Sequence, residues 1–68
     1  MVYKIKKFGG NLTEYDNGKI VLTYLGSGKG ASVAGYDKRT GVPLRVARGF
    51  NSKTVARLYL KRLKKRFS

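Results

Sequence analysis

Apolar and polar residues alternate over most of the first fifty positions, which is the pattern of β-strands. Met1 to Phe8 predicts a short strand at a sheet edge, because neither of its faces is purely apolar. Leu12 to Tyr15 predicts a brief strand, joined to the next one by Asp16-Asn17-Gly18, a strong signal for a tight hairpin. Lys19 to Leu25 is the clearest strand, and apolar residues on both of its faces indicate partial cover from both sides.

Two more strands are expected after the glycine-rich segment Gly26 to Gly30, which predicts an open, flexible connection. Ala31 to Asp37 forms the first of them and has unusually small side chains. Asp37 to Gly41 predicts a hairpin turn, and Val42 to Arg48 predicts the returning strand. Because Pro43 has no N–H to donate, we expect this strand at an edge or with Pro43 facing outward.

The period changes from two to 3.6 residues after Phe50. Asn51 or Ser52 is a good N-cap, and the following residues to Phe67 predict a helix. Its expected buried stripe is Ala56, Tyr59, Leu60, Leu63 and Phe67, widened by Val55 or Leu58. The sequence therefore predicts one α+β domain, an antiparallel sheet of three to five strands with a C-terminal helix on one face. Residues 1–18 would form an N-terminal strand or hairpin, residues 19–50 the sheet, and residues 51–67 the helix.

The charge balance is strongly basic, with 16 Lys and Arg residues against three acids and a formal net charge of +13. The cations run from Lys4 to Arg66 and are interleaved with apolar positions, so they do not form a separate basic tail. Self-repulsion at this charge opposes a compact fold unless an anionic partner relieves it. A polyanionic partner is therefore expected, and nucleic acid is the usual one for so basic a domain.

Several function classes are disfavoured by the residue inventory. The chain has no His and no Cys, so the commonest general base, the thiol nucleophile and most transition-metal ligands are missing. We therefore expect no enzymatic activity, no metal, no cofactor and no small-molecule substrate. Without cysteines or a long apolar run, the sequence favours a cytoplasmic protein that does not insert into a membrane. The segment around Lys29 lacks the spacing and the following helix of a nucleotide-binding loop.

Candidate contacts with nucleic acid fall in the loops, the sheet and the helix. Lys29 and the exposed amides of its glycine-rich segment are placed to touch a phosphate backbone. Arg45 is expected opposite Val42, Leu44 and Val46, on the sheet surface away from the helix, where Ser32, Ala34 and Tyr36 would leave room for close approach to a groove. The helix offers a second basic face, formed by Arg57, Lys61, Lys64 and Lys65. The same composition is also ordinary for a helix face that is simply exposed to solvent.

The order of motifs resembles a known family. Three consecutive segments are similar to the arm-binding N-terminal domains of tyrosine integrases. They are Gly35 to Gly41, Val42 to Arg48, and the run from Gly49 to Ala56 that opens the helix. Those domains are in turn similar to the plant ethylene-response-factor DNA-binding domain. In this pattern Gly49 permits a sharp exit from the sheet, Phe50 fills the junction between helix and sheet, and Ala56 brings the helix close.

The resemblance implies a duplex-DNA-binding protein whose sheet enters the major groove while the helix supports it from behind. The implied contacts are Tyr36, Lys38, Arg39, Arg45 and Arg48. The first eighteen residues have no counterpart in the family and no catalytic domain follows, so an accessory, regulatory or architectural role, like that of phage or mobile-element proteins, is implied. Two alternatives stay open: a double-stranded-RNA-binding domain, and a small basic phage-type inhibitor that docks on an acidic host protein.

Overall fold

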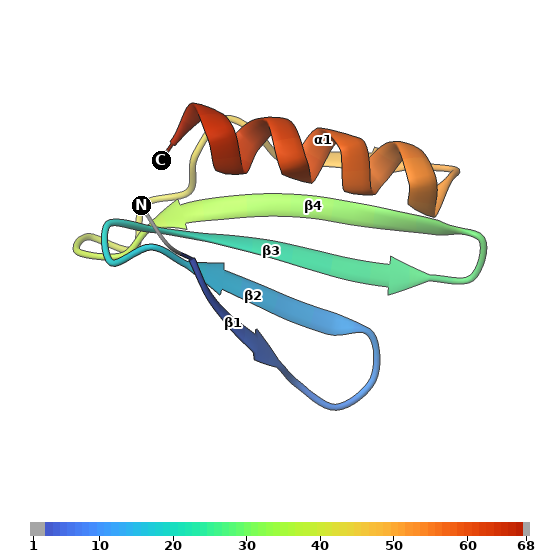
Figure 1. The fold of residues 1–68 in the computed structure, drawn as a ribbon, viewed down its shortest axis with the longest axis horizontal. Coiled ribbons are helices and arrows are strands. Elements are labelled where there is room, and N and C mark those ends of the chain that lie inside the picture. Colours follow the sequence, from blue (N-terminus) through green and yellow to red (C-terminus); the bar gives the residue numbers. More distant parts are fainter. Residues whose placement is uncertain (1–2, 68) are drawn as a thin grey trace.

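The computed structural model describes residues 3–67 and has five strands followed by one helix. The elements are β1 (Lys4–Lys7), β2 (Leu12–Asp16), β3 (Ile20–Ser27), β4 (Gly30–Asp37), β5 (Arg48–Phe50) and α1 (Lys53–Arg66). All neighbouring strands pair antiparallel in the order β1-β2-β3-β4-β5, and the helix covers one face (Figure 1). The predicted α+β architecture is confirmed, with β1 at the sheet edge. Met1, Val2 and Ser68 lie outside the described residues.

Strand register decides which side chains face the helix, because residues directly opposite each other on neighbouring strands point to the same side. Leu22 pairs with Gly35, and Tyr24 pairs with Val33, on the helix side. The core on this side joins strand residues to one stripe of the helix, and its buried members are Ile20, Leu22, Ala31, Val33, Val46, Ala56, Leu60 and Leu63. The predicted stripe is confirmed at its centre, with Tyr59 and Phe67 partly buried at its flanks. Val55 and Leu58 do not widen it, since they are 48% and 57% exposed.

The two central strands form one long hairpin rather than two strands with an open connection between them. Ser27 pairs with Gly30, so only Gly28 and Lys29 form the turn. Gly28 has φ of +57°, a left-handed conformation that glycine adopts without steric cost and that two-residue hairpin turns require. The expectation of an open, flexible segment at Gly26 to Gly30 was therefore wrong, because Gly26 and Gly30 lie in the paired strands and only Gly28 lies in the tight turn.

The predicted strand over Val42 to Arg48 was also wrong. The chain starts to pair with β4 through one bridge between Tyr36 and Pro43, and the Leu44 amide donates to the Gly35 carbonyl. It then turns at Arg45 and Val46 and rejoins β4 only at β5. The Val46 side chain is buried in the core, and its carbonyl accepts a 2.7 Å hydrogen bond from the Tyr59 hydroxyl. The helix thus satisfies a backbone group that a continuous strand would have paired with the sheet.

Side-chain hydrogen bonds fix both ends of the helix, and at the C-terminal end they come from distant parts of the chain. Ser52 is the N-cap, and its hydroxyl accepts from the Val55 amide. At the other end, the Tyr3 hydroxyl donates to the Lys64 carbonyl at 3.1 Å and the Asn17 side-chain amide donates to the Phe67 carbonyl at 2.9 Å. These bonds satisfy carbonyls that have no partner within the helix. Among the described residues, no helix is long and apolar enough to cross a membrane.

We expect Tyr59→Phe to lower the free energy of unfolding by about 1 kcal/mol, because it leaves the buried Val46 carbonyl without its donor while keeping the ring beside Phe50. Tyr36→Phe, which loses a hydroxyl on the opposite face of the sheet, is the matched control and should change stability by less than about 0.5 kcal/mol. Urea unfolding followed by circular dichroism measures both. Equal effects would mean that the Tyr59 bond does not hold the segment before β5.

Candidate nucleic-acid interface

Charge is divided unevenly between the two sides of the sheet. The helix contains no acidic residue and seven cations, Lys53, Arg57, Lys61, Arg62, Lys64, Lys65 and Arg66. By strand register, Lys7 and Arg48 also face the helix side, because they pair with Thr13 and Val33. Glu14 and Asp16 lie on the open face, which the helix does not cover, whereas the third acid, Asp37, pairs with Ile20 on the helix side at the end of β4. The positive potential of the domain is therefore concentrated on the side of the helix.

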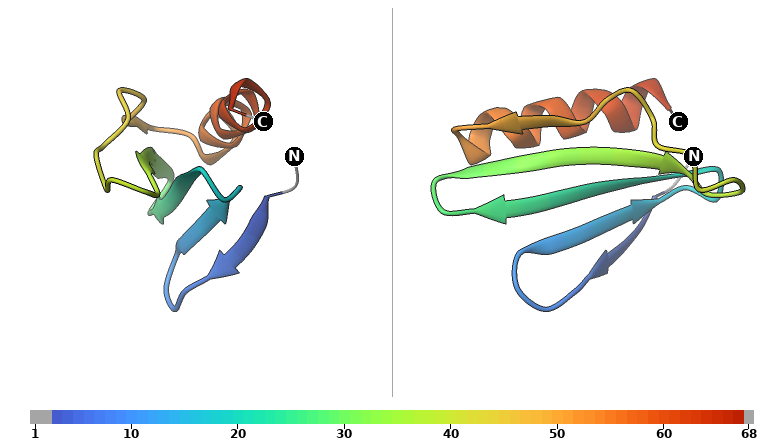
Figure 2. Two further views of the ribbon diagram at one scale, coloured as in Figure 1. Left: turned by 90° about the vertical axis from the view of Figure 1, so that its left-hand side faces the viewer. Right: turned by 180° about the vertical axis from the view of Figure 1, so that it is seen from behind.

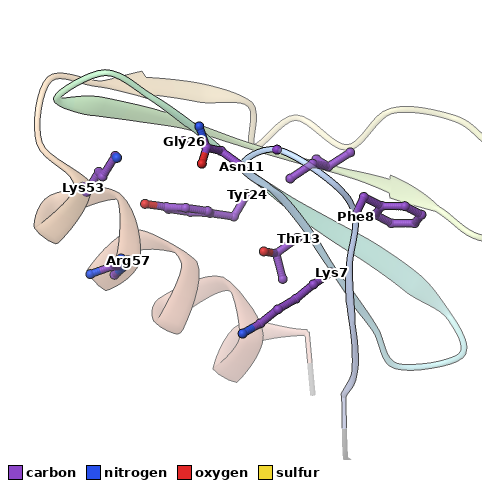
Figure 3. A pocket seen from close by; sticks show the side chains of 10 residues that line it. Lys7, Phe8, Asn11, Thr13, Tyr24, Gly26, Lys53 and Arg57 are labelled. Atoms are coloured by element: carbon purple, nitrogen blue, oxygen red, sulfur yellow. The ribbon is translucent and has the colours of Figure 1, made fainter.

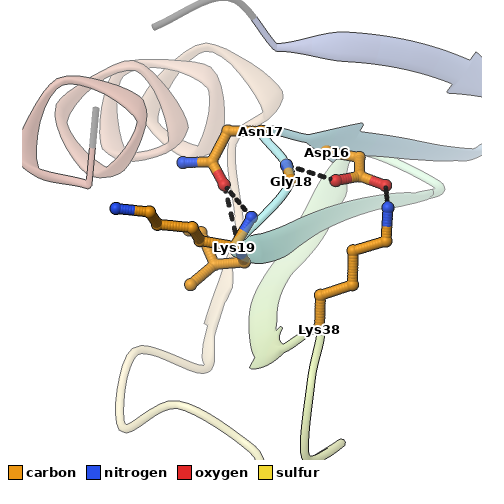
Figure 4. Close-up of polar contacts among 6 residues, drawn as sticks. Asp16, Asn17, Gly18, Lys19 and Lys38 are labelled. Carbon is orange, nitrogen blue, oxygen red and sulfur yellow. Dashed lines mark hydrogen bonds and ion pairs between the residues drawn. The ribbon is translucent and has the colours of Figure 1, made fainter.

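The open face of the sheet is much less basic. Its strand cations Lys4 and Lys6 lie directly opposite Asp16 and Glu14. Lys38 forms an ion pair with Asp16 at 2.6 Å, the one ion pair found between residues 3 and 67 (Figure 4). This hydrogen bond, with a second from the Gly18 amide, lowers the pKa of the Asp16 carboxyl. A lowered pKa means that the pair contributes to stability near neutral pH and loses that contribution as the pH falls through the pKa in the folded state.

The residues first predicted to contact DNA do not form one surface. Lys29 lies in the β3–β4 turn, whereas Lys38 and Arg39 follow the far end of β4, roughly 25 Å away at the rise of a β-strand. Tyr36 is on the open face and half-buried, and Lys38 is already paired with Asp16. Arg45 is exposed in the turn before β5, so the expectation that it projects from a strand was wrong.

Arg48 lies on the helix side of the sheet, whereas DNA binding by the open face would require it on the other side. Its guanidinium is 5.4 Å from the ring centroid of Phe50 and 5.6 Å from that of Tyr59, so it covers the junction between β5 and the helix. The Phe50 and Tyr59 rings pack against each other at a tilt, with their centroids 5.2 Å apart, as the role predicted for Phe50 requires. The structure thus brings Arg48 together with the basic helix, whereas Lys38 is paired with Asp16 on the open face.

The secondary set of basic helix residues is divided between two helix faces. Lys61 and Lys65 are exposed, whereas Arg57 and Lys64 border a groove between the helix and the β1–β2 hairpin. The Lys64 ammonium lies 4.6 Å from the centroid of the Tyr15 ring, which is close enough for a cation–π contact. The end-on view shows the sheet curling round the helix, with the β1–β2 hairpin at one side (Figure 2).

That groove contains residues that the sequence interpretation did not single out. Two pockets of about 290 and 320 Å³ share Lys7, Thr13, Tyr24 and Arg57. Lys53 lies at one end of the groove and Lys64 at the other. The spacing of Lys53, Arg57 and Lys64 places all three on one flank of a helix, so the sequence does contain this signal. Lys7 lies far away in the sequence, on β1, and only the fold of the sheet brings it to the same groove.

Comparisons of the chain with protein-family models, with curated proteins and with solved structures found no match. The candidate site is therefore defined by the geometry and charge of the chain itself.

We expect Lys38→Met to raise the pKa of Asp16 towards its ordinary value, because the hydrogen bond from Lys38 that lowers the pKa most is removed while the Gly18 amide still donates. An NMR pH titration of the Asp16 carboxyl carbon measures this change. Arg39→Met removes the same charge from the neighbouring position and serves as the control. If both variants shift the pKa equally, the pair with Lys38 is not populated in solution and Lys38 is available to another anion.

Proposed function

We propose that this chain is a non-enzymatic, duplex-DNA-binding domain and that the exposed side of its helix, rather than the open face of its sheet, meets the DNA. The observation that carries the proposal is the separation of charge: seven cations and no acid on the helix, with Glu14 and Asp16 on the opposite face. A phosphate backbone would be attracted to the first side, whereas carboxylates on the second would repel it. An accessory or architectural role stays part of this proposal, but the docking of the sheet in the major groove that the integrase resemblance implies does not.

Helix dimensions favour DNA over RNA as the duplex. Fourteen residues make a helix of about 21 Å, and the major groove of B-DNA is wide enough to admit one. The major groove of an RNA duplex is deep and narrow, so the same helix could reach only its phosphates. Thr54, Leu58 and Lys61 are exposed on the outward face, where the short Thr54 and the apolar Leu58 can approach base edges.

A titration at about 50 mM salt should give micromolar or tighter binding to duplex DNA, and weaker binding to duplex RNA and to single strands of the same sequence. The affinity should fall steeply with salt, by a log–log slope of about −0.9 for each phosphate neutralised, so that four phosphate contacts would give about −4. Tighter binding to duplex RNA would favour the RNA-binding alternative. Absence of binding to all three nucleic acids would overturn the proposal and favour an acidic protein as the partner.

The contact surface is tested with two double variants that remove the same charge from opposite sides. Lys61→Ala/Arg62→Ala, on the exposed part of the helix, should weaken duplex binding about tenfold or more and make the salt slope shallower by about two, as expected for two lost phosphate contacts. Lys4→Ala/Lys6→Ala, on the open face, should change either quantity far less.

The variant Arg45→Ala completes this comparison. If Arg45 made a base contact, Arg45→Ala would lose about 1–3 kcal/mol of binding free energy, with a larger loss on a preferred sequence. If the helix side meets the DNA, as proposed, Arg45→Ala should bind duplex DNA nearly as well as the unchanged protein. A selective loss with Arg45→Ala, together with normal binding by the helix variant, would show that the sheet side is the contact surface.

A further inference from the structure

The end of the groove beside the first turns of the helix is a pocket with an unusual collection of side chains. Its volume is about 290 Å³, and it is bordered by the tip of the β1–β2 hairpin, by β3 and by the helix (Figure 3). Lys7, Lys53 and Arg57 contribute three positive charges from two elements, and none of the described residues lining it is acidic. Thr13, Asn11 and Tyr24 add uncharged polar groups.

Tyr24 is the most informative of these residues. Its hydroxyl is shielded from solvent and makes no hydrogen bond with any of residues 3–67. Leaving a buried hydroxyl unpaired costs free energy, so a buried tyrosine usually finds a partner. In Figure 3 the hydroxyl end of Tyr24 points towards the side of the helix that carries Lys53 and Arg57. An unpaired hydroxyl is therefore directed towards Lys53 and Arg57, where an anion would accept its hydrogen bond.

The local backbone shapes the pocket for this purpose. The Gly26 amide donates to the Asn11 carbonyl at 3.0 Å and so fixes the hairpin tip to the end of β3. Gly26 also has no side chain, and a Cβ there would lie 3.5 Å from Cε of Lys53 and 3.3 Å from Cβ of Asn11. The 3.5 Å separation is an ordinary van der Waals distance, so the Lys53 stem lies against the end of β3, and only the contact with Asn11 would be tight.

We propose that this pocket binds a phosphate monoester group, held by Lys7, Lys53 and Arg57 with hydrogen bonds from Thr13 and Tyr24. Three cations without a neighbouring carboxylate favour a dianion over a singly charged group, and Arg57 can donate two parallel hydrogen bonds to phosphate oxygens. A monoester also has one more free oxygen than the diester of an unbroken strand. The volume equals that of roughly ten waters, which leaves room for the sugar to which such a group is attached.

Two sources can supply this chemistry: free inorganic phosphate and the terminal 5′-phosphate of a nucleic-acid strand. The site does not depend on the helix entering a duplex, because Lys61 and Arg62 are not among its lining residues. Phosphate binding and duplex binding can therefore succeed or fail separately.

The experiment is an NMR titration of the full chain with inorganic phosphate, compared with sodium chloride at equal ionic strength. Saturable shifts confined to Lys7, Thr13, Tyr24, Lys53 and Arg57 are expected. The second arm compares a 5′-phosphorylated oligonucleotide with the same strand ending in a hydroxyl, and the phosphorylated strand should bind several-fold more tightly. If phosphate saturates the site but the 5′-phosphate gives no advantage, free phosphate is the ligand and the site still stands.

Two matched pairs of variants locate the effect. Arg57→Gln should weaken phosphate binding about tenfold or more, whereas Arg62→Gln, which removes the same charge from the other flank of the helix, should leave it unchanged. Tyr24→Phe should weaken it about two- to tenfold without lowering the melting temperature, because the hydroxyl has no partner in the protein to lose. If the Tyr24 hydroxyl were purely structural, Tyr24→Phe would instead lower the melting temperature and leave phosphate binding unchanged.

Non-saturating shifts, or equal effects of Arg57→Gln and Arg62→Gln on phosphate binding, would overturn the proposal. Duplex DNA binding that persists in that case would leave the proposed function intact. Conversely, saturable phosphate binding by a chain that does not bind duplex DNA would keep the pocket and reject the function.

Discussion

The packing of helix α1 against the two central strands is the interaction on which the rest of the structure depends. Ala56 is fully buried and has almost no side chain, so the helix lies close to the sheet, and Leu60 and Leu63 extend the contact towards its C-terminal end. Leu22 and Val33 are the largest fully buried side chains on the sheet side. So few core residues must hold together a domain of 68 residues with a charge of +13. A domain of this size has little stability in reserve.

The same contact determines where the cations go. Because one stripe of the helix is committed to the core, its Lys and Arg residues are confined to the exposed side and the two flanks. One flank faces the groove beside β1 and β2, and the other meets Arg48 at β5. Repulsion among cations gathered in this way opposes folding, and an anion bound between them would relieve it. The proposed binding surfaces therefore coincide with the part of the fold where a ligand would stabilise it most.

The sequence interpretation succeeded for elements whose pattern is local. The hairpin at Asp16-Asn17-Gly18, the Ser52 cap and the buried stripe of the helix each follow from neighbouring residues and their spacing. It failed where a long-range partner decided the outcome. Val42 to Arg48 alternates like a strand, but Tyr59 takes the Val46 carbonyl and Val46 turns into the core. Gly26 to Gly30 has the composition of a flexible loop, yet the pairing of β3 with β4 closes it into a two-residue turn.

The sequence by itself determined the fold class, the single helix and a strongly basic surface, because periodicity, capping and net charge are properties of the chain in order. Only the tertiary structure decided which cations act together. It paired Lys38 with Asp16, placed Arg48 beside the helix, and brought Lys7 across from Lys53 and Arg57 at the rim of one pocket. Lys7 and Arg57 are fifty residues apart. Their meeting depends on how the sheet curls round the helix, and no local pattern of residues encodes that curvature.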